Sequence, residues 1–146
     1  MAGRIPQRLR QAVEQRAARR CEYCRCPLAV TTEPFAVEHV IPTVRGGAAT
    51  PDNLALSCSG CNGHKDDRIE GYDPVSQSRA ALYHPRKHAW SEHFAWNEDY
   101  SRVIGLTPTG RATVKTLHLN REGVVNLRRL LLLVGLHPPE ATEASS

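Results

Sequence analysis

Two pairs of cysteines with C-x-x-C spacing are the residues of this chain best suited to hold a metal ion: Cys21 with Cys24, and Cys58 with Cys61. Four thiolates suit a tetrahedral zinc site, and a site closed by four protein ligands leaves no coordination position for catalysis. We therefore expect a structural Zn²⁺. A redox dithiol is the alternative, which two matched pairs disfavour. Cys26 could replace Cys24 as a ligand, but CEYC matches CSGC in spacing, so Cys26 is expected to stay free.

The segment of 33 residues between the two pairs is longer than the roughly 15–20 residues of a simple zinc ribbon. It contains the dipeptide Glu38-His39, two adjacent glycines and Asn53, and Asn62 directly follows the last cysteine. A neutral imidazole can remove a proton from water near pH 7. Carboxylate and amide oxygens favour hard ions such as Mg²⁺ or Mn²⁺. A base and a divalent ion together suit the hydrolysis of a phosphodiester bond.

The order Glu-His, Gly-Gly, Asn-Leu and C-x-x-C-Asn-x-x-Lys resembles the HNH (ββα-metal) nuclease family, and the resemblance spans residues 20–68. It implies that His39 is the general base and that Asn53 holds the loop between two strands and helps to orient the base. It also implies that Glu38 and Asn62 bind one catalytic divalent ion. The cysteines match the zinc-bound subset of the family. The chain departs from the commonest pattern at two positions, with Glu38 in place of Asp and Asn62 in place of His.

Further polar residues lie close to this motif. His64 could be a third ligand of the catalytic ion, and the alternative is a histidine on a helix surface. Arg45, Lys65 and Arg68 could contact DNA phosphate, although each could equally be a solvated charge. The remaining histidines, His118 among them, show no metal-binding pattern.

Composition favours a nucleic-acid partner. The net charge is +4, and 16 of the 19 basic residues are arginine, whose guanidinium group matches phosphate geometry. A soluble, slightly basic protein is the alternative reading of the same charge. The sequence has no evident signal peptide or transmembrane run. We therefore expect a cytoplasmic protein without membrane contact, in which C-x-x-C pairs bind metal and do not form disulfides.

The first half of the chain is expected to form an α+β unit that positions these residues. A helix is predicted over 5–19, short strands over 35–41 and 54–57, and a second helix over 62–69. We expect a zinc-stapled ββα-metal, treble-clef-like core within residues 1–70, preceded by its N-terminal helix.

The second half is expected to add a C-terminal β-hairpin plus helix, packed on the core over residues 71–138. Residues 71–88 are predicted to be irregular, 90–96 to form a strand, and 102–119 a hairpin with Gly110 in its turn. A final helix over 122–134, capped by Asn120, has an apolar stripe wider than one face. It is therefore either well buried or bound to a partner, as in a homodimer. Residues 139–146 are predicted to be a disordered tail.

The leading hypothesis is a metal-dependent HNH endonuclease or nickase that acts on DNA. A non-catalytic zinc module that binds nucleic acid is the second hypothesis, and a treble-clef-type protein-interaction domain is the third. The joint presence of Glu38, His39 and Asn62 favours the first. The target, the choice between DNA and RNA, and the biological setting are left open by the sequence.

Overall fold

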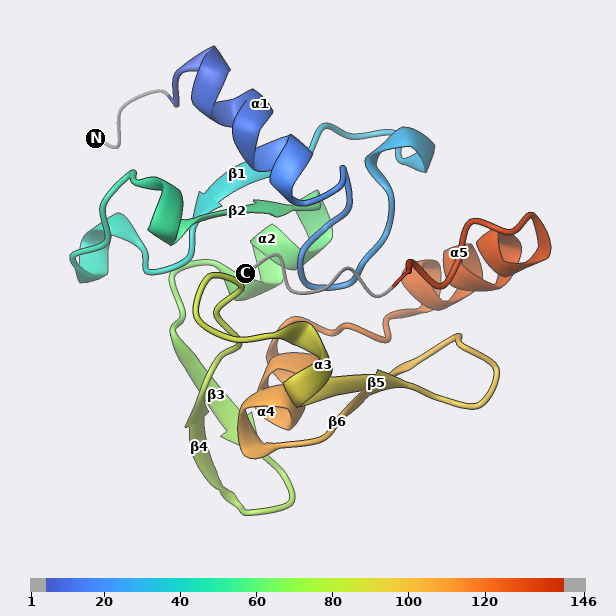
Figure 1. The fold of residues 1–146 in the computed structure, drawn as a ribbon. Coiled ribbons are helices and arrows are strands. Elements are labelled where there is room, and N and C mark those ends of the chain that lie inside the picture. Colours follow the sequence, from blue (N-terminus) through green and yellow to red (C-terminus); the bar gives the residue numbers. More distant parts are fainter. Residues whose placement is uncertain (1–4, 141–146) are drawn as a thin grey trace.

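Three two-stranded antiparallel sheets, joined and flanked by helices, make up the computed structural model, which describes residues 5–140 (Figure 1). In chain order the helices and strands are α1 (Gln7–Arg16), β1 (Ala36–His39), β2 (Leu54–Ser57), α2 (Ser59–Lys65), β3 (Glu70–Asp73), β4 (Ser78–Ala81), α3 (Trp90–His93), β5 (Phe94–Trp96), β6 (Val103–Gly105), α4 (Pro108–Thr116) and α5 (Glu122–Leu133). Together they form a small α+β domain around a cluster of cysteines, which confirms the expected fold class.

The ββα unit comprises β1, β2 and α2. The strands pair from Ala36 opposite Ser57 to His39 opposite Leu54, so the expected pair of strands is confirmed. Helix α2 begins three residues earlier than predicted, because the sulfur of Cys58 accepts a hydrogen bond from the backbone N–H of Cys61 and caps the first turn.

Helix α2 also ends earlier than predicted. Its last residue is Lys65, and Asp66 has a φ of 52°, a left-handed conformation that stops the helix. The predicted helix over 62–69 was therefore displaced toward the C-terminus by several residues. A short α2 confines Asn62 and Lys65 to its final turns, next to the sheet formed by β1 and β2.

Helix α1 anchors the N-terminal segment on β2. Val13 is buried on its inner face, and the guanidinium group of Arg16 donates hydrogen bonds to the carbonyl oxygens of Pro51 (2.9 Å) and Leu54 (2.6 Å). The helix stops at Arg16, earlier than the predicted residue 19, because Ala18 and the residue after it have positive φ angles.

Residues 70–81 form the hairpin of β3 and β4, so the prediction of irregular structure over 71–88 is wrong there. The carboxylate of Asp73 accepts hydrogen bonds from the backbone N–H groups of Val75 and Ser76, which closes the turn. The guanidinium group of Arg111, on α4, also donates to both carboxylate oxygens of Asp73, at 2.8 and 3.0 Å. The side chain of Asp73 thus organises a turn at Pro74, within the segment predicted to be irregular.

The predicted hairpin around Gly110 is also wrong. Residues 108–116 are helical, because Thr107 caps α4 by accepting a hydrogen bond from the N–H of Gly110 at 2.9 Å, and Pro108 occupies the first turn. The strand β6 pairs instead with β5, and the four residues before β5 form the short helix α3 rather than an extended strand.

The final helix, α5, agrees with its prediction, but its cap does not. Arg121 is the N-cap residue, whereas the side chain of Asn120 exchanges two hydrogen bonds with the backbone of Val103 and so holds β6. Gly135, with a φ of 77°, follows the end of the helix. Of the expected tail, residues 141–146 lie outside the described part of the chain.

One hydrophobic cluster includes side chains from both halves of the chain, such as Val13 and Leu54 from the first half and Phe94 and Leu117 from the second. Buried polar contacts join the halves as well. The guanidinium group of Arg128, on α5, donates to the carbonyl oxygen of Cys24 at 3.2 Å. Within residues 5–140, no helix is both long enough and apolar enough to cross a membrane.

Candidate active site

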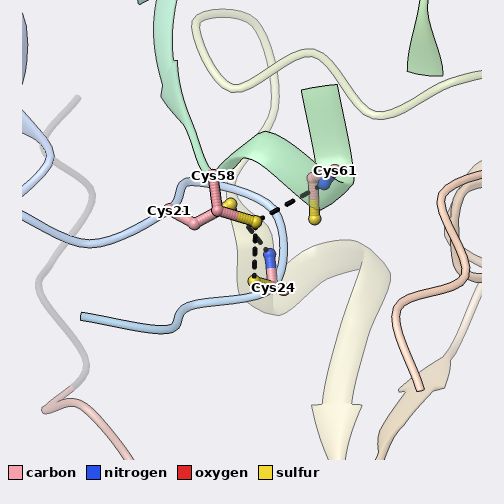
Figure 2. Close-up of side chains that lie close together, drawn as sticks. All are labelled: Cys21, Cys24, Cys58 and Cys61. Atoms are coloured by element: carbon pink, nitrogen blue, oxygen red, sulfur yellow. Dashed lines mark hydrogen bonds between the residues drawn. The ribbon is translucent and has the colours of Figure 1, made fainter. Parts of the chain in front are cut away.

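The four cysteines of the C-x-x-C pairs converge in space. Their sulfur atoms all lie within 4.8 Å of one another, and all four residues are buried (Figure 2). One pair lies in the loop after α1 and the other at the N-terminus of α2. Backbone N–H groups donate to the first sulfur of each pair, from Cys24 to Cys21 at 3.5 Å and from Cys61 to Cys58 at 3.4 Å. This donor set could hold one zinc ion and fits a closed structural site.

Ionisation of four neighbouring thiols requires a counter-charge. Hydrogen bonds from neighbouring thiols lower the pKa values of Cys24 and Cys58. Burial raises the pKa of Cys21, and hydrogen bonding to Cys21 raises the pKa of Cys61. A divalent cation would favour the thiolate at all four positions, because bound metal ions deprotonate the thiols that coordinate them. The thiol chemistry therefore also fits a bound cation.

Cys26 lies beside this cluster but outside the group of four sulfurs that could share one ion. Its sulfur is 3.4 Å from that of Cys24, and its carbonyl oxygen accepts a hydrogen bond from the N–H of Cys21 at 2.9 Å. All five cysteines are free thiols in the structure. The backbone of Cys26 therefore helps to shape the first loop that carries zinc ligands.

Arg121 is a residue of the cysteine site that the sequence did not reveal. Its guanidinium group donates to Cys58 Sγ at 3.4 Å and to Cys61 Sγ at 3.6 Å. Although burial lowers the pKa of Arg121, the neighbouring thiolates raise it overall. A cation here offsets the negative charge of a four-thiolate site. Arg121 is 60 residues from Cys61 in sequence, and no local pattern links the two.

Glu38 and Lys65 form a buried ion pair between β1 and α2. Lys65 Nζ lies 3.3 Å from Glu38 Oε2 and donates to the carbonyl oxygen of Val40 at 2.8 Å. Lys65 is only 1% exposed. Burial raises the pKa of Glu38, and the ammonium group of Lys65 opposes that shift. The structure therefore gives Lys65 an internal role in place of the predicted phosphate contact, because its side chain points to β1 rather than to solvent.

The second carboxylate oxygen of Glu38 lies outside the ion pair with Lys65. Among residues 5–140, neither Glu38 Oε1 nor the hydroxyl group of Tyr23 has a partner with hydrogen-bond geometry, and both atoms are buried. The two groups nevertheless interact, because burial and then the Glu38 carboxylate raise the pKa of Tyr23, and the hydroxyl group opposes the rise in the pKa of Glu38. A buried polar atom without a partner costs free energy, and the Tyr23 hydroxyl group, a water molecule or a cation could each satisfy this oxygen. This oxygen fits the expected role of Glu38 as a metal ligand.

Asn53 closes the loop between β1 and β2. Its side chain accepts a hydrogen bond from the N–H of Ile41 at 2.9 Å and donates to the carbonyl oxygens of Ile41 (3.0 Å) and Ala48 (2.9 Å). Gly47 passes so close to Ile41 and Asn53 that a Cβ atom would collide with both. The Gly-Gly sequence and Asn53 thus fix the backbone just beyond His39, which is half-buried at the end of β1.

Helix α2 presents Asn62 and His64 on different sides. Residues two apart in an α-helix are separated by about 200° around its axis, whereas residues three apart share a face. Asn62 therefore lies on the side of Lys65 and Glu38. His64 instead packs against His118, with ring centroids 4.4 Å apart. The structure does not place His64 on the side of Asn62, which argues against the suggested third ligand.

Arg45 and Arg68 are both exposed, as a contact to DNA phosphate requires. Arg45 Nε donates to the carbonyl oxygen of Asp67 at 2.6 Å, and Arg68 Nη1 donates to that of His64 at 3.3 Å. These hydrogen bonds restrain both side chains near α2 and leave their remaining N–H groups for a ligand.

A family model described as HNH endonuclease matches residues 21–68, about a third of the chain. The matched segment begins at the first cysteine of the metal cluster and contains β1, β2 and α2. It therefore coincides with the ββα unit and with every candidate site residue named above except Arg121 and His118. No curated protein and no solved structure shows a significant match to this chain.

Proposed function

We propose that this protein is a metal-dependent endonuclease that hydrolyses DNA phosphodiester bonds, either by nicking or by double-strand cleavage. The single observation that carries the proposal is the match of residues 21–68 to the HNH family, within which the buried carboxylate of Glu38 keeps one oxygen outside its ion pair with Lys65. Glu38 and Asn62 would hold one Mg²⁺ or Mn²⁺ ion, on the side of α2 that faces β1. A structural Zn²⁺ on the four cysteines would hold the loop after α1 to the N-terminus of α2.

His39 is the proposed general base. Its neutral imidazole takes a proton from the attacking water, and its place at the end of β1 leaves it partly accessible. Asn53 fixes the following loop through three hydrogen bonds and so limits the positions that His39 can adopt. The divalent ion, when bound, supplies positive charge to the phosphate and the leaving oxygen.

Lys65 is a positioning residue in this proposal. Its ammonium group contacts one oxygen of Glu38 and leaves the other outside the ion pair. Arg45 and Arg68, at the surface around α2, would contact the DNA backbone.

The proposal is tested by cleavage of supercoiled plasmid over a range of Mg²⁺ and Mn²⁺ concentrations. Glu38→Gln should need at least about tenfold more metal for the same rate, because a neutral amide binds a hard cation more weakly. Because this substitution alone leaves Lys65 buried without its partner, the double variant Glu38→Gln/Lys65→Met serves as a second measurement free of that cost. Unchanged metal dependence in both variants would reject Glu38 as a ligand.

A non-catalytic zinc module that binds nucleic acid is the second candidate, and the Glu38–Lys65 pair is the observation that favours it. An ion pair inside the ββα unit can stabilise the fold without any part in catalysis. This candidate predicts salt-dependent DNA binding without cleavage at any metal concentration.

We also propose that α5 mediates a homodimer. Leu130, Leu133 and Val134 are 62%, 81% and 67% exposed, and one apolar helix can pair with its own copy in a two-fold dimer. Light scattering after size-exclusion chromatography should give a dimer mass for the wild type and a monomer mass for Leu133→Glu.

A further inference from the structure

An open pocket lies between α2 and α4, away from the side of α2 that carries Asn62. The turn after α2 and strand β3 complete its wall. Its lining residues are Gly63, His64, Arg68, Tyr72, Lys115, Thr116 and His118. The pocket therefore joins the segment that matches the HNH model to the second half of the chain, which that model does not cover.

The two charged side chains that line this pocket are basic, and Asp66 and Asp67, which precede Arg68 in the turn, do not line it. Arg68 and Lys115 are exposed, and within the described residues neither forms a salt bridge. No aspartate or glutamate lines the pocket. Two cations without counter-ions on facing elements create a positive potential that an anion would neutralise.

The hydrogen-bonding groups suit a phosphate. The guanidinium group of Arg68 and the ammonium group of Lys115 are the usual partners of phosphate oxygens, and Thr116 and the imidazole groups of His64 and His118 add further donors. Tyr72 is 42% exposed at the edge of the pocket and offers an aromatic face for a sugar or base. A transition metal fits less well, because only two of the lining side chains, His64 and His118, are usual metal ligands.

We propose that this pocket binds a backbone phosphate of the DNA substrate, so that α4 extends the surface of the nuclease unit. The inference rests on the proposed function in taking DNA as the ligand. Arg68 from the first half and Lys115 from the second grip one stretch of backbone, and their contact sets the register of the duplex relative to His39. The pocket gives the second half of the chain a direct part in substrate binding.

The test is fluorescence anisotropy of a labelled DNA duplex, without added Mg²⁺ or Mn²⁺, in a His39→Ala background and at several salt concentrations. Arg68→Ala and Lys115→Ala should each weaken DNA binding about fivefold. Each should also reduce, by about one, the magnitude of the slope of the logarithm of the association constant against the logarithm of the salt concentration. Arg129→Ala, which removes an exposed arginine from α5, is the matched control and should bind as the parent does.

The outcomes separate this proposal from the proposed nuclease function. Weaker binding by Lys115→Ala as well as by Arg68→Ala supports the pocket, even if the wild type cleaves no DNA. Weaker binding by Arg68→Ala alone would show only the DNA contact already proposed for Arg68 and would overturn the pocket proposal. If the wild type cleaves DNA while both pocket variants bind with parental affinity and parental salt slope, the pocket proposal is overturned and the nuclease proposal stands. Circular dichroism of each variant must match the parent, since α4 also packs on β3.

Discussion

Glu38 and Lys65 show how one buried pair can link stability to a candidate metal site. The carboxylate and the ammonium group are 6% and 1% exposed, so each has lost most of its hydration. Their attraction only partly offsets that loss, and the pKa of Glu38 stays raised by burial. Because a divalent ion at Oε1 would favour the ionised form, metal binding and deprotonation of Glu38 should be coupled.

We predict that Lys65→Met lowers the free energy of unfolding by about 3–5 kcal/mol, because it leaves Glu38 buried without its counter-ion. The double variant Glu38→Gln/Lys65→Met should recover a large part of that loss. Urea denaturation of the zinc-loaded proteins measures both. Equal stability of Lys65→Met and wild type would show that the pair is not maintained in solution.

The sign of the pH effect follows from the raised pKa of Glu38. The folded state binds the proton of Glu38 more tightly than the unfolded chain does, so the contribution of this group to stability is present below the unfolded pKa and is lost as pH rises through the folded pKa. Added Mn²⁺ should therefore raise the melting temperature more at pH 7 than at pH 5. A shift that does not depend on pH, or that is equal in Glu38→Gln, would contradict the coupling.

At the scale of elements, the local sequence predicted β1, β2 and α5, because clear sequence signals mark where these elements begin and end. Asn53 and Cys58 flank β2 closely, and its four residues were placed correctly. The same approach failed where one sequence supports two structures. The residues Thr107 to Gly110 read as a hairpin turn, yet they cap a helix, because Gly110 packs tightly against the backbone of His93 and Gly105. The contact between Gly110 and His93 joins α4 to α3, so local reasoning could not find it.

The residues of the candidate site also fall into those that local sequence reveals and those that only the structure reveals. The cysteine pairs and the Glu-His motif were recognisable because their residues are close in sequence or regularly spaced. The burial of Lys65 depends on its contact with Val40, 25 residues away, and Arg121 reaches the cysteines over 60 residues. Neither contact has a local signature, so Lys65 was taken for a surface residue and Arg121 was not considered.

We predict that Arg121→Ala weakens zinc binding by about tenfold, because the cation next to Cys58 and Cys61 is lost. Competition with a chromogenic zinc chelator measures the affinity. Arg129→Ala is the control of equal charge on α5 and should leave zinc affinity unchanged. If Arg121→Ala retains parental affinity, the contact with the thiolates has no energetic role.

At the scale of the whole molecule, the four cysteines join the loop after α1 to the N-terminus of α2, and the hydrophobic cluster around them includes residues of the second half. Arg128, which is 2% exposed, adds a contact from α5 to the carbonyl oxygen of Cys24. Loss of the metal should therefore disturb α5 as well as the loops that carry the cysteines.

We predict that Cys58→Ser loses zinc and unfolds cooperatively at room temperature, because the binding free energy of a structural zinc ion is largely folding free energy. Cys26→Ser is the matched control and should retain both zinc and fold. Elemental analysis and circular dichroism measure the two properties. A folded, zinc-free Cys58→Ser protein would reject the structural role of the site.

The most direct test of the nuclease proposal is the conversion of supercoiled plasmid by zinc-loaded protein with Mg²⁺ or Mn²⁺, comparing wild type with His39→Ala. The account predicts nicked or linear DNA from the wild type alone, with zinc content and circular dichroism unchanged in the variant. Equal cleavage by both proteins would contradict His39 as the base. The absence of cleavage by both, despite salt-dependent binding of the same plasmid, would contradict the nuclease function itself.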